Sequence, residues 1–334
     1  MVSFPRRQFL QYAASAAAIP AISQIASAQT YPSRLITVIV PTGAGGPQDV
    51  VARVVTEHMR GTLGQALIVE NVPGANGTLG IGRVYRAKPD GYTIAFSVSS
   101  STHVFNPAVY SLPYDVINDF EPIGLATKDG GQLIVAKKST PANNLNELVA
   151  WMRASPGRAS LGHTGPGSPA HITGIMFQKL TGTRLQDVTY RSAAQAMQDV
   201  IAGHIDAMVT SPSIALAPVQ AGLVKAYAVA ASSRLAAAPH IPTVDEAGLP
   251  GFYAAGWFAL WAPKGTPRDI IGKLNAALVD ALADNSVRAR LADLGLDIFP
   301  REKQTPEALR ILQKAEIEKW WPIIKEADIK TRAE

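Results

Sequence analysis

The residues of this chain whose types and spacing best suit chemistry lie in two glycine-rich segments. The first, residues 41–53, reads PTGAGGPQDVVAR and follows an apolar run, so its glycines would turn the backbone tightly between a strand and a helix. The unpaired N–H groups in the first turn of a helix favour an anion at such a place. The Lys and the Ser or Thr of a nucleotide phosphate loop are missing, as is the dinucleotide spacing of three glycines. We therefore expect a carboxylate or a small polar solute here, the alternative being a plain strand-to-helix turn.

The second segment, residues 160–170, reads SLGHTGPGSPA and repeats this arrangement. Gly165 and Gly167 free the backbone, and Ser168 before Pro169 predicts a capped helix start with outward-facing N–H groups. Two such segments far apart in the chain predict two α/β lobes that face each other across a cleft. A helix terminus contributes only about 0.3–1 kcal/mol to an exposed anion. Because micromolar binding needs roughly 8 kcal/mol, both lobes must close on the ligand together.

Several charged or nucleophilic side chains near these segments have both a structural and a chemical interpretation. Asp49 lies in the first turn of its helix, where it either caps the helix or contacts the ligand, and Arg53 is expected to pair with it. Arg191 follows a strand and either binds a carboxylate or lies on the surface. Ser168 near His171 suggests an exported hydrolase, but the Gly-x-Ser-x-Gly elbow is missing and a capping Ser is poorly placed as a nucleophile. We therefore do not expect an enzyme.

The composition of the 334 residues argues against several classes of partner and cofactor. There is no cysteine, which excludes disulfides, thiol nucleophiles and thiolate metal sites. The six histidines show no metal-ligand spacing, so we expect neither a metal nor a cofactor. The net charge of +5 is mild and the basic residues are scattered, which argues against nucleic acid as a partner.

The first 28 residues have the features of a cleaved export signal. Two adjacent arginines precede an apolar, Ala-rich run that ends in Ala-Ser-Ala, which predicts cleavage after Ala28. The arginine pair resembles a twin-arginine signal, with the general export route as the alternative. No later run reaches the roughly 20 apolar residues of a membrane span. We expect a soluble periplasmic protein, and a monomer as the simplest state.

Alternating strands and helices are predicted from end to end. After the apolar run at 35–40, strands are expected at residues 67–69, 93–98, 133–136, 159–161, 188–190, 207–209, 226–231 and 258–262. Asn144 followed by Glu147 forms a capping box, and Ile270, Leu274, Leu278 and Leu282 form an apolar stripe on one helix. This alternation predicts parallel sheets with helices on both faces.

The chain resembles the Bug family, the extracytoplasmic solute-binding receptors of tripartite tricarboxylate transporters. The resemblance rests on both glycine segments, on VTYRSAAQAMQDVIAGHIDAM at 188–208 and on RLAAAPHIPTVDEAGLPGF at 234–252. It continues through Gly256 and the C-terminal Trp320-Trp321 helix, and so covers essentially the whole mature chain. Ser192 and His163 depart from the family pattern, which leaves the identity of the ligand open.

The resemblance implies a type II periplasmic binding protein with two Rossmann-like lobes and a ligand cleft between them. Lobe one would comprise residues 31–129 and 234–334, and lobe two residues 130–233. The implied function is capture of a small di-, tri- or aromatic carboxylate and its delivery to a membrane permease. The alternative is a binding protein that presents its bound form to a signalling partner.

The predicted ligand-binding residues come from several parts of the chain. The resemblance carries over Thr42, Gly45, Gly46, Gly165, Gly167 and Ser168 as ligand contacts. Ser99 and Ser100 offer hydroxyls after the strand at 93–98, and Tyr190 and Asp206 lie at comparable positions in the second lobe. Asp49 and Arg191 complete the predicted set.

Overall fold

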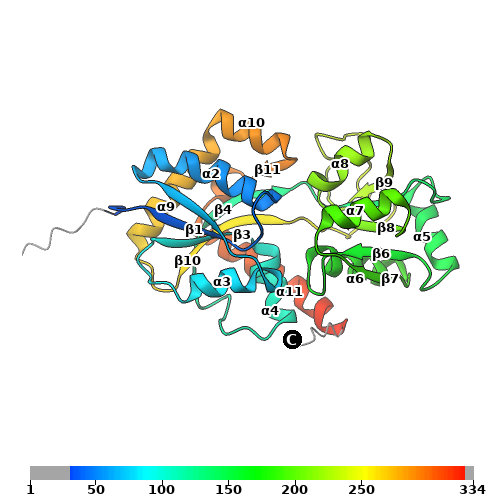
Figure 1. Ribbon diagram of the computed structural model, residues 1–334, viewed down its shortest axis with the longest axis horizontal. Coiled ribbons are helices and arrows are strands. Elements are labelled where there is room, and N and C mark those ends of the chain that lie inside the picture. Colours follow the sequence, from blue (N-terminus) through cyan, green and yellow to red (C-terminus); the bar gives the residue numbers. More distant parts are fainter. Residues whose placement is uncertain (1–30, 328–334) are drawn as a thin grey trace, which may run out of the picture.

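Two β-sheets, each covered by helices, form two lobes that lie side by side (Figure 1). The computed structural model describes residues 31–327, so the predicted export signal and its cleavage point after Ala28 lie outside the described residues. Within residues 31–327, no helix combines the length and the hydropathy that a membrane span requires. The two-lobed α/β architecture confirms the predicted fold class.

Lobe one is built on a six-stranded sheet with the order β11-β4-β10-β3-β1-β2. Its strands are β1 (Ile36–Val40), β2 (Leu67–Asn71), β3 (Thr93–Val98), β4 (Phe120–Asp129), β10 (Trp257–Pro263) and β11 (Leu296–Ile298). β1 is parallel to β2 and β3, whereas β10 runs antiparallel to β3 and β4.

Lobe two is built on a five-stranded sheet with the order β7-β6-β8-β5-β9. Its strands are β5 (Leu133–Lys137), β6 (Ser160–His163), β7 (Gln186–Thr189), β8 (Ala207–Thr210) and β9 (Val224–Val229). β6 is parallel to β7 and β8, whereas β5 is antiparallel to β8 and β9. The prediction of parallel sheets therefore holds only in part, because β5 and β10 each enter a sheet directly from the other lobe and run antiparallel to their neighbours.

The helices bury their apolar faces against the sheet of their own lobe. Lobe one has α2 (Pro47–Leu63), α3 (Thr78–Tyr85), α4 (Asn106–Val109), α9 (Arg268–Ala283), α10 (Asn285–Asp293) and α11 (Pro306–Glu326), with the short 3₁₀ helices η1 (Ala75–Gly77) and η3 (Arg301–Lys303) and the π-helix η2 (Ser101–Phe105). Lobe two has α5 (Leu145–Ala154), α6 (Pro169–Thr181), α7 (Ala193–Ala202) and α8 (Pro212–Gln220). The predicted stripe on α9 is confirmed, since Leu274, Leu278 and Leu282 are buried and Ile270 is partly buried against the same core.

The strands β4 and β11 were missed by the sequence prediction. β4 contains Pro122 and Gly124, both of which argue against a strand in the interior of a sheet. The structure accommodates Pro122 because β11 pairs only with residues 127–129, so β4 has a neighbour on one side alone at the proline. At Gly124 a Cβ would lie 2.6 Å from the carbonyl oxygen of Gln304, so only glycine fits this close backbone contact.

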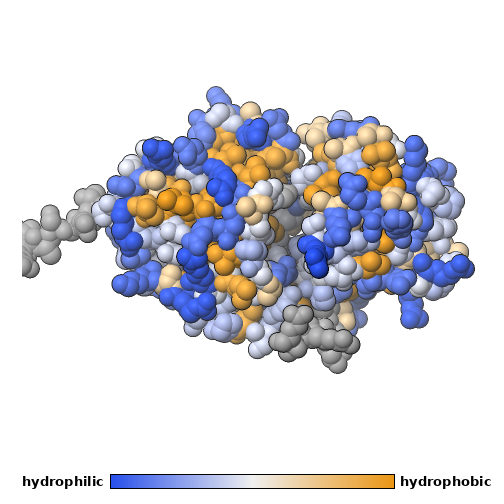
Figure 2. All heavy atoms as spheres, viewed as in Figure 1, coloured by the Kyte–Doolittle hydropathy of each residue, from blue (hydrophilic) through white to orange (hydrophobic). Residues whose placement is uncertain are grey.

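Two crossover segments join the lobes and run beside each other. The Asp129 N–H donates to the Gly256 carbonyl at 2.9 Å, and the Gln132 N–H donates to the Ala254 carbonyl at 2.8 Å. We call residues 129–132 and 254–256 the crossovers. Beside them a hollow separates the two lobes in the space-filling view (Figure 2).

The segment that follows β9 packs on lobe two before the chain returns to lobe one. Leu235 and Ile241 are buried in a cluster with Leu133 of β5, and the Val244 N–H donates to the Val229 carbonyl at 2.9 Å. The sequence prediction assigned residues 234–252 to lobe one. Leu235 and Ile241 instead share a buried cluster with residues of the second sheet and of α7 and α8.

Candidate functional site

A cavity of about 260 Å³ lies between the lobes. It is lined by lobe one, by lobe two and by both crossovers, through residues that include Thr42, Gly46, Thr164, Thr210 and Gly256. Ligand pockets begin at roughly 300 Å³, so a cavity of this size suits a small molecule rather than a nucleotide.

The first turns of four helices line this cavity. Gln48 belongs to the first turn of α2, Ala170 to that of α6, Ala193 to that of α7 and Ser213 to that of α8. Helix N-termini carry unpaired N–H groups and the positive end of the helix dipole. Among the described residues that line the cavity, none is Lys or Arg. The arrangement therefore offers an anion backbone dipoles and hydroxyl groups instead of a formal positive charge.

The first glycine loop is held in shape by Asp49. The Gly45 N–H donates to Asp49 Oδ2 at 2.9 Å, and Gly45 has a φ of +78°, which favours glycine. Arg53 Nε and Asn71 Nδ2 also donate to this carboxylate, each at 3.0 Å, so the predicted pairing of Asp49 with Arg53 is confirmed. Burial raises the pKa of Asp49, but the hydrogen bonds from Arg53, Gly45 and Asn71 outweigh it and lower the pKa below its usual value. Asp49 is buried and Gly45 is exposed, and neither lines the cavity.

Thr42 and Gly46 are the two predicted contacts of the first loop that do line the cavity. Thr42 Oγ1 is buried and has no hydrogen-bond partner among the described residues. A buried hydroxyl without a partner costs free energy, which a ligand that bonds to it would recover. Gly46 is the N-cap of α2, and it has no side chain that would cover the first turn.

The second glycine loop gives its N–H groups to two histidines. The Gly165 N–H donates to His163 Nδ1 and the Gly167 N–H to His171 Nδ1, both at 3.1 Å. Ser168 Oγ accepts the His171 backbone N–H at 3.3 Å, which confirms the predicted helix cap. Gly165, Gly167 and Ser168 do not line the cavity, whereas their neighbours His163 and Thr164 do.

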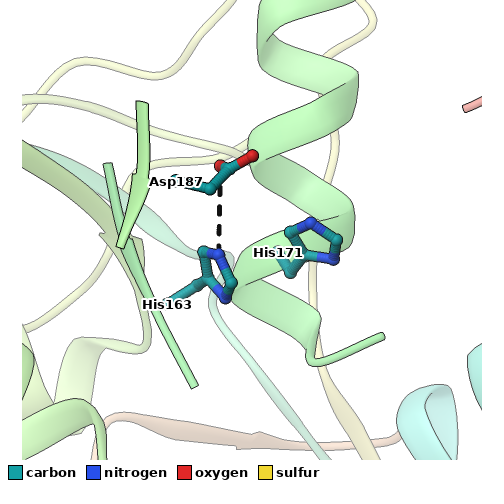
Figure 3. A group of neighbouring side chains, drawn as sticks. All are labelled: His163, His171 and Asp187. Carbon is teal, nitrogen blue, oxygen red and sulfur yellow. Dashed lines mark ion pairs between the residues drawn. The ribbon is translucent and has the colours of Figure 1, made fainter. Parts of the chain in front are cut away.

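The same two histidines meet Asp187 of β7 (Figure 3). His163 Nε2 lies 3.9 Å from Asp187 Oδ1 and has no hydrogen-bond partner among the described residues, and one possible ligand atom from each of the three residues lies within 4.8 Å of the others. Burial lowers the pKa of His163, and it lowers the pKa of His171 to about 4, so both rings are neutral at pH 7. Imidazole nitrogen and carboxylate oxygen are both ligand types of zinc, but the Nδ1 atom of each ring already accepts a backbone N–H in this loop. The spacing of the histidines along the sequence gave no sign of this group.

The serines after β3 lie deeper than the cavity wall. Ser99 Oγ accepts the indole N–H of Trp261 at 2.9 Å, which fixes that hydroxyl inside lobe one. Ser100 Oγ is buried and has no partner among the described residues. Neither serine lines the cavity.

Tyr190, Arg191 and Asp206 also lie away from the cavity lining. The Tyr190 hydroxyl donates to Asp199 Oδ2 at 2.7 Å, and burial together with this bond raises the pKa of Tyr190 to about 12. Arg191 is exposed after β7. Asp206 precedes β8 and pairs with Lys137 Nζ at 2.6 Å, whereas the cavity is lined from Met208 onward, toward the other end of that strand.

The crossovers contribute cavity residues that the sequence analysis missed. Asp129, Gln132 and Gly256 all line the cavity, and so does Ser211, the N-cap of α8. A signal for Ser211 was present, because Ser211-Pro212 repeats the Ser-Pro pair at the start of α6. No local motif marks Asp129, whose partner Gly256 lies 127 residues further along the chain.

Comparison with known proteins places this architecture in a family. The model of the tripartite tricarboxylate transporter family receptor matches residues 51–329. A UPF0065 protein of Agrobacterium vitis, from the TAR-I ttuE-ttuC' intergenic region, is 37% identical over 98% of this chain and 93% of its own. The solved structure of the periplasmic binding protein BugD is 36% identical, with a TM-score of 0.79 over 90% of this chain and 99% of its own.

A second solved structure resembles the chain equally well. MatC from Rhodopseudomonas palustris, solved with bound malate, is 37% identical, with a TM-score of 0.80 over 88% of this chain and all of its own. The family model spans most of the sequence, and both solved structures share the two-lobed fold of this chain. The chain therefore belongs to the Bug family, the receptors of tripartite tricarboxylate transporters.

Proposed function

We propose that this receptor captures a small carboxylate in the cavity between its lobes and delivers it to the membrane subunits of a tripartite tricarboxylate transporter. The observation that carries the proposal is the meeting of four helix N-termini at one small cavity. The malate in the structure of MatC supports a dicarboxylate-sized ligand.

The predicted contact residues take different parts in this proposal. Thr42 and Gly46 contact the carboxylate directly, because they line the cavity and offer a hydroxyl without a partner and an open helix start. Gly165, Gly167 and Ser168 do not contact the ligand but fix the loop conformation that directs the first turn of α6 toward the cavity. Asp49 and Gly45 do the same for α2.

Closure of the lobes around the ligand is the working step of the proposed cycle. The crossovers are short and hydrogen-bonded to each other, so they suit a hinge about which the lobes rotate. We propose that lobe one comprises residues 31–129 and the chain from β10 onward. Lobe two then comprises residues 130–233 together with residues 234–252, which pack on its sheet.

The cellular setting is part of the same proposal. The chain is exported, cleaved after Ala28 and works in the periplasm as a soluble monomer. The permease subunits bind its ligand-loaded, closed form.

A thermal-shift screen of the mature protein, residues 29–334, tests the proposed function. The panel holds mono-, di-, tri- and aromatic carboxylates, amino acids and neutral solutes. A ligand that binds only the folded state stabilises it by about 2.7 kcal/mol at a hundred times its Kd. We expect the melting temperature to rise with one class of carboxylate, and a response confined to neutral solutes would contradict the proposal.

A further inference from the structure

A buried carboxylate faces the proposed ligand cavity from the first crossover. Asp129 is only 8% exposed and lines the cavity. Its Oδ1 accepts the Gly256 N–H at 2.7 Å and the Gly131 N–H at 3.3 Å. Its Oδ2 has no hydrogen-bond partner among the described residues. These bonds fix the carboxylate and leave one oxygen available to a ligand.

Gly256 keeps this second oxygen open. A Cβ at position 256 would lie 2.7 Å from Asp129 Oδ2, closer than a real Cβ contact. Gly256 itself lines the cavity, so a side chain there would both displace the carboxylate and cover it. Asp129 and Gly256 together therefore form a fixed, buried hydrogen-bond acceptor that faces the cavity.

The charge of the cavity makes this acceptor informative about the ligand. The described residues that line the cavity include no Lys or Arg, and His163 is the only other titratable group among them. An ionised Asp129 would repel a ligand that carries carboxylates alone. It would attract a ligand that also carries a positively charged hydrogen-bond donor.

The cavity thus has two unlike kinds of wall: helix N-termini that suit a carboxylate, and an acceptor on the crossover that suits a cation. We propose that the ligand is an amino carboxylate, with its carboxylate held at the helix N-termini and its protonated amine bonded to Asp129 Oδ2. This inference rests on the proposed function and specifies its substrate class.

Calorimetry with matched ligand pairs tests the role of the amine. The pairs are aspartate with succinate, glutamate with glutarate, and phenylalanine with 3-phenylpropionate, so that chain length does not decide the result. In the wild-type protein the amino member of the pair that fits should bind roughly tenfold tighter or more. In Asp129→Asn this preference should disappear, while Asp269→Asn, an exposed carboxylate on α9, should retain it.

A pH series on the wild-type protein gives the same answer without a variant that has to fold. Burial raises the pKa of Asp129 to about 7, opposed by the bonds from Gly256 and Gly131 and reinforced by Asp297. Lys128 adjoins Asp129 in the chain, and His163, which burial keeps neutral, lines the cavity with it. The preference for the amino member should therefore grow between pH 6 and pH 8, as Asp129 ionises.

The outcomes separate this inference from the proposed function. If the unsubstituted member binds as tightly as the amino member or more tightly, or if malate binds more tightly than aspartate, the inference fails and carboxylate capture stands. Affinity for succinate that falls as the pH rises would point instead to a protonated Asp129 that donates to a carboxylate. If no member of any pair binds, and the wider carboxylate panel is also silent, the proposed function fails as well.

Discussion

Asn76 Nδ2 donates a hydrogen bond of 3.0 Å to the carbonyl oxygen of Gly167, which joins a turn of lobe one to the glycine loop of lobe two. The Tyr110 hydroxyl donates to the Pro166 carbonyl at 3.0 Å and forms a second bond of the same kind. A Cβ on Gly167 would lie 3.0 Å from Val109, so the loop rests closely on lobe one. These contacts hold the second glycine loop against lobe one.

Asn76→Ala should weaken ligand binding by about 0.5–1.5 kcal/mol, because it removes a bond that forms when the lobes meet. The measurement is the Kd for the ligand identified in the screen, and Tyr110→Phe should act in the same direction. Asn118→Ala serves as control, since the Asn118 side chain donates to Asp115 within lobe one and bonds to no residue of lobe two among residues 31–327. Equal Kd values in all these proteins would show that the contact plays no part in closure.

Thr42→Val should lower the affinity for a carboxylate by roughly 1–3 kcal/mol, because it removes a donor to a charged group. The folded protein should not be destabilised, since the Thr42 hydroxyl has no partner among the described residues. Thr62→Val, at an exposed position of α2, is the matched control. Unchanged affinity in Thr42→Val would remove this hydroxyl from the binding site.

Asp206→Asn should reduce the free energy of unfolding at pH 7 by roughly 1–3 kcal/mol and leave ligand affinity unchanged. Burial raises the pKa of Asp206, but the hydrogen bonds from Lys137 and Ser160 outweigh burial, so the pKa lies below its ordinary value of 3.8. A lowered folded pKa means that the stabilisation is present above the unfolded pKa and is lost as the pH falls through the folded one. The deficit of the variant, measured by urea unfolding, should thus shrink below about pH 4. Loss of ligand binding without loss of stability would return Asp206 to the site.

His103→Gln should make the stability of lobe one less sensitive to acid. His103 is fully buried against Trp261, with ring centroids 4.3 Å apart, and burial lowers its pKa from 6.5 to about 3. Its contribution is therefore complete above the unfolded pKa and declines by about 1.4 kcal/mol per pH unit as the pH falls from the unfolded pKa toward the folded one. The free energy of unfolding, measured with urea between pH 6 and pH 4.5, should fall less steeply with decreasing pH in the variant, by up to that amount per pH unit. An identical slope would mean that the ring titrates normally in the folded protein.

Much of the fold could be predicted from local sequence, because residues close together in the chain determine where a strand, a loop or a helix begins. The capping box at Asn144 is present, with the Glu147 N–H donating to Asn144 Oδ1 at 2.9 Å. β4 was missed because Pro122 is acceptable only where β11 does not pair, and the short β11 gives almost no signal of its own.

The ligand cavity was predicted less completely, for physical reasons. Its crossover wall depends on the bond between Asp129 and Gly256, which no spacing in the sequence reveals. Asp206 was included although it precedes its strand, and the cavity lies toward the other end of β8. The N–H groups of Gly165 and Gly167 were expected to face outward, but two histidines of the same segment accept their hydrogen bonds.

The return of the chain through both crossovers sets the order in which the lobes can be completed during synthesis. Every strand of lobe two lies between residues 133 and 229, and its covering segment ends by residue 252. The sheet of lobe one stays divided until β10 is inserted between β3 and β4. Because domains fold as units while the chain grows, we expect lobe two to fold first. The N-terminal part of lobe one can complete its sheet only after β10 has been synthesised.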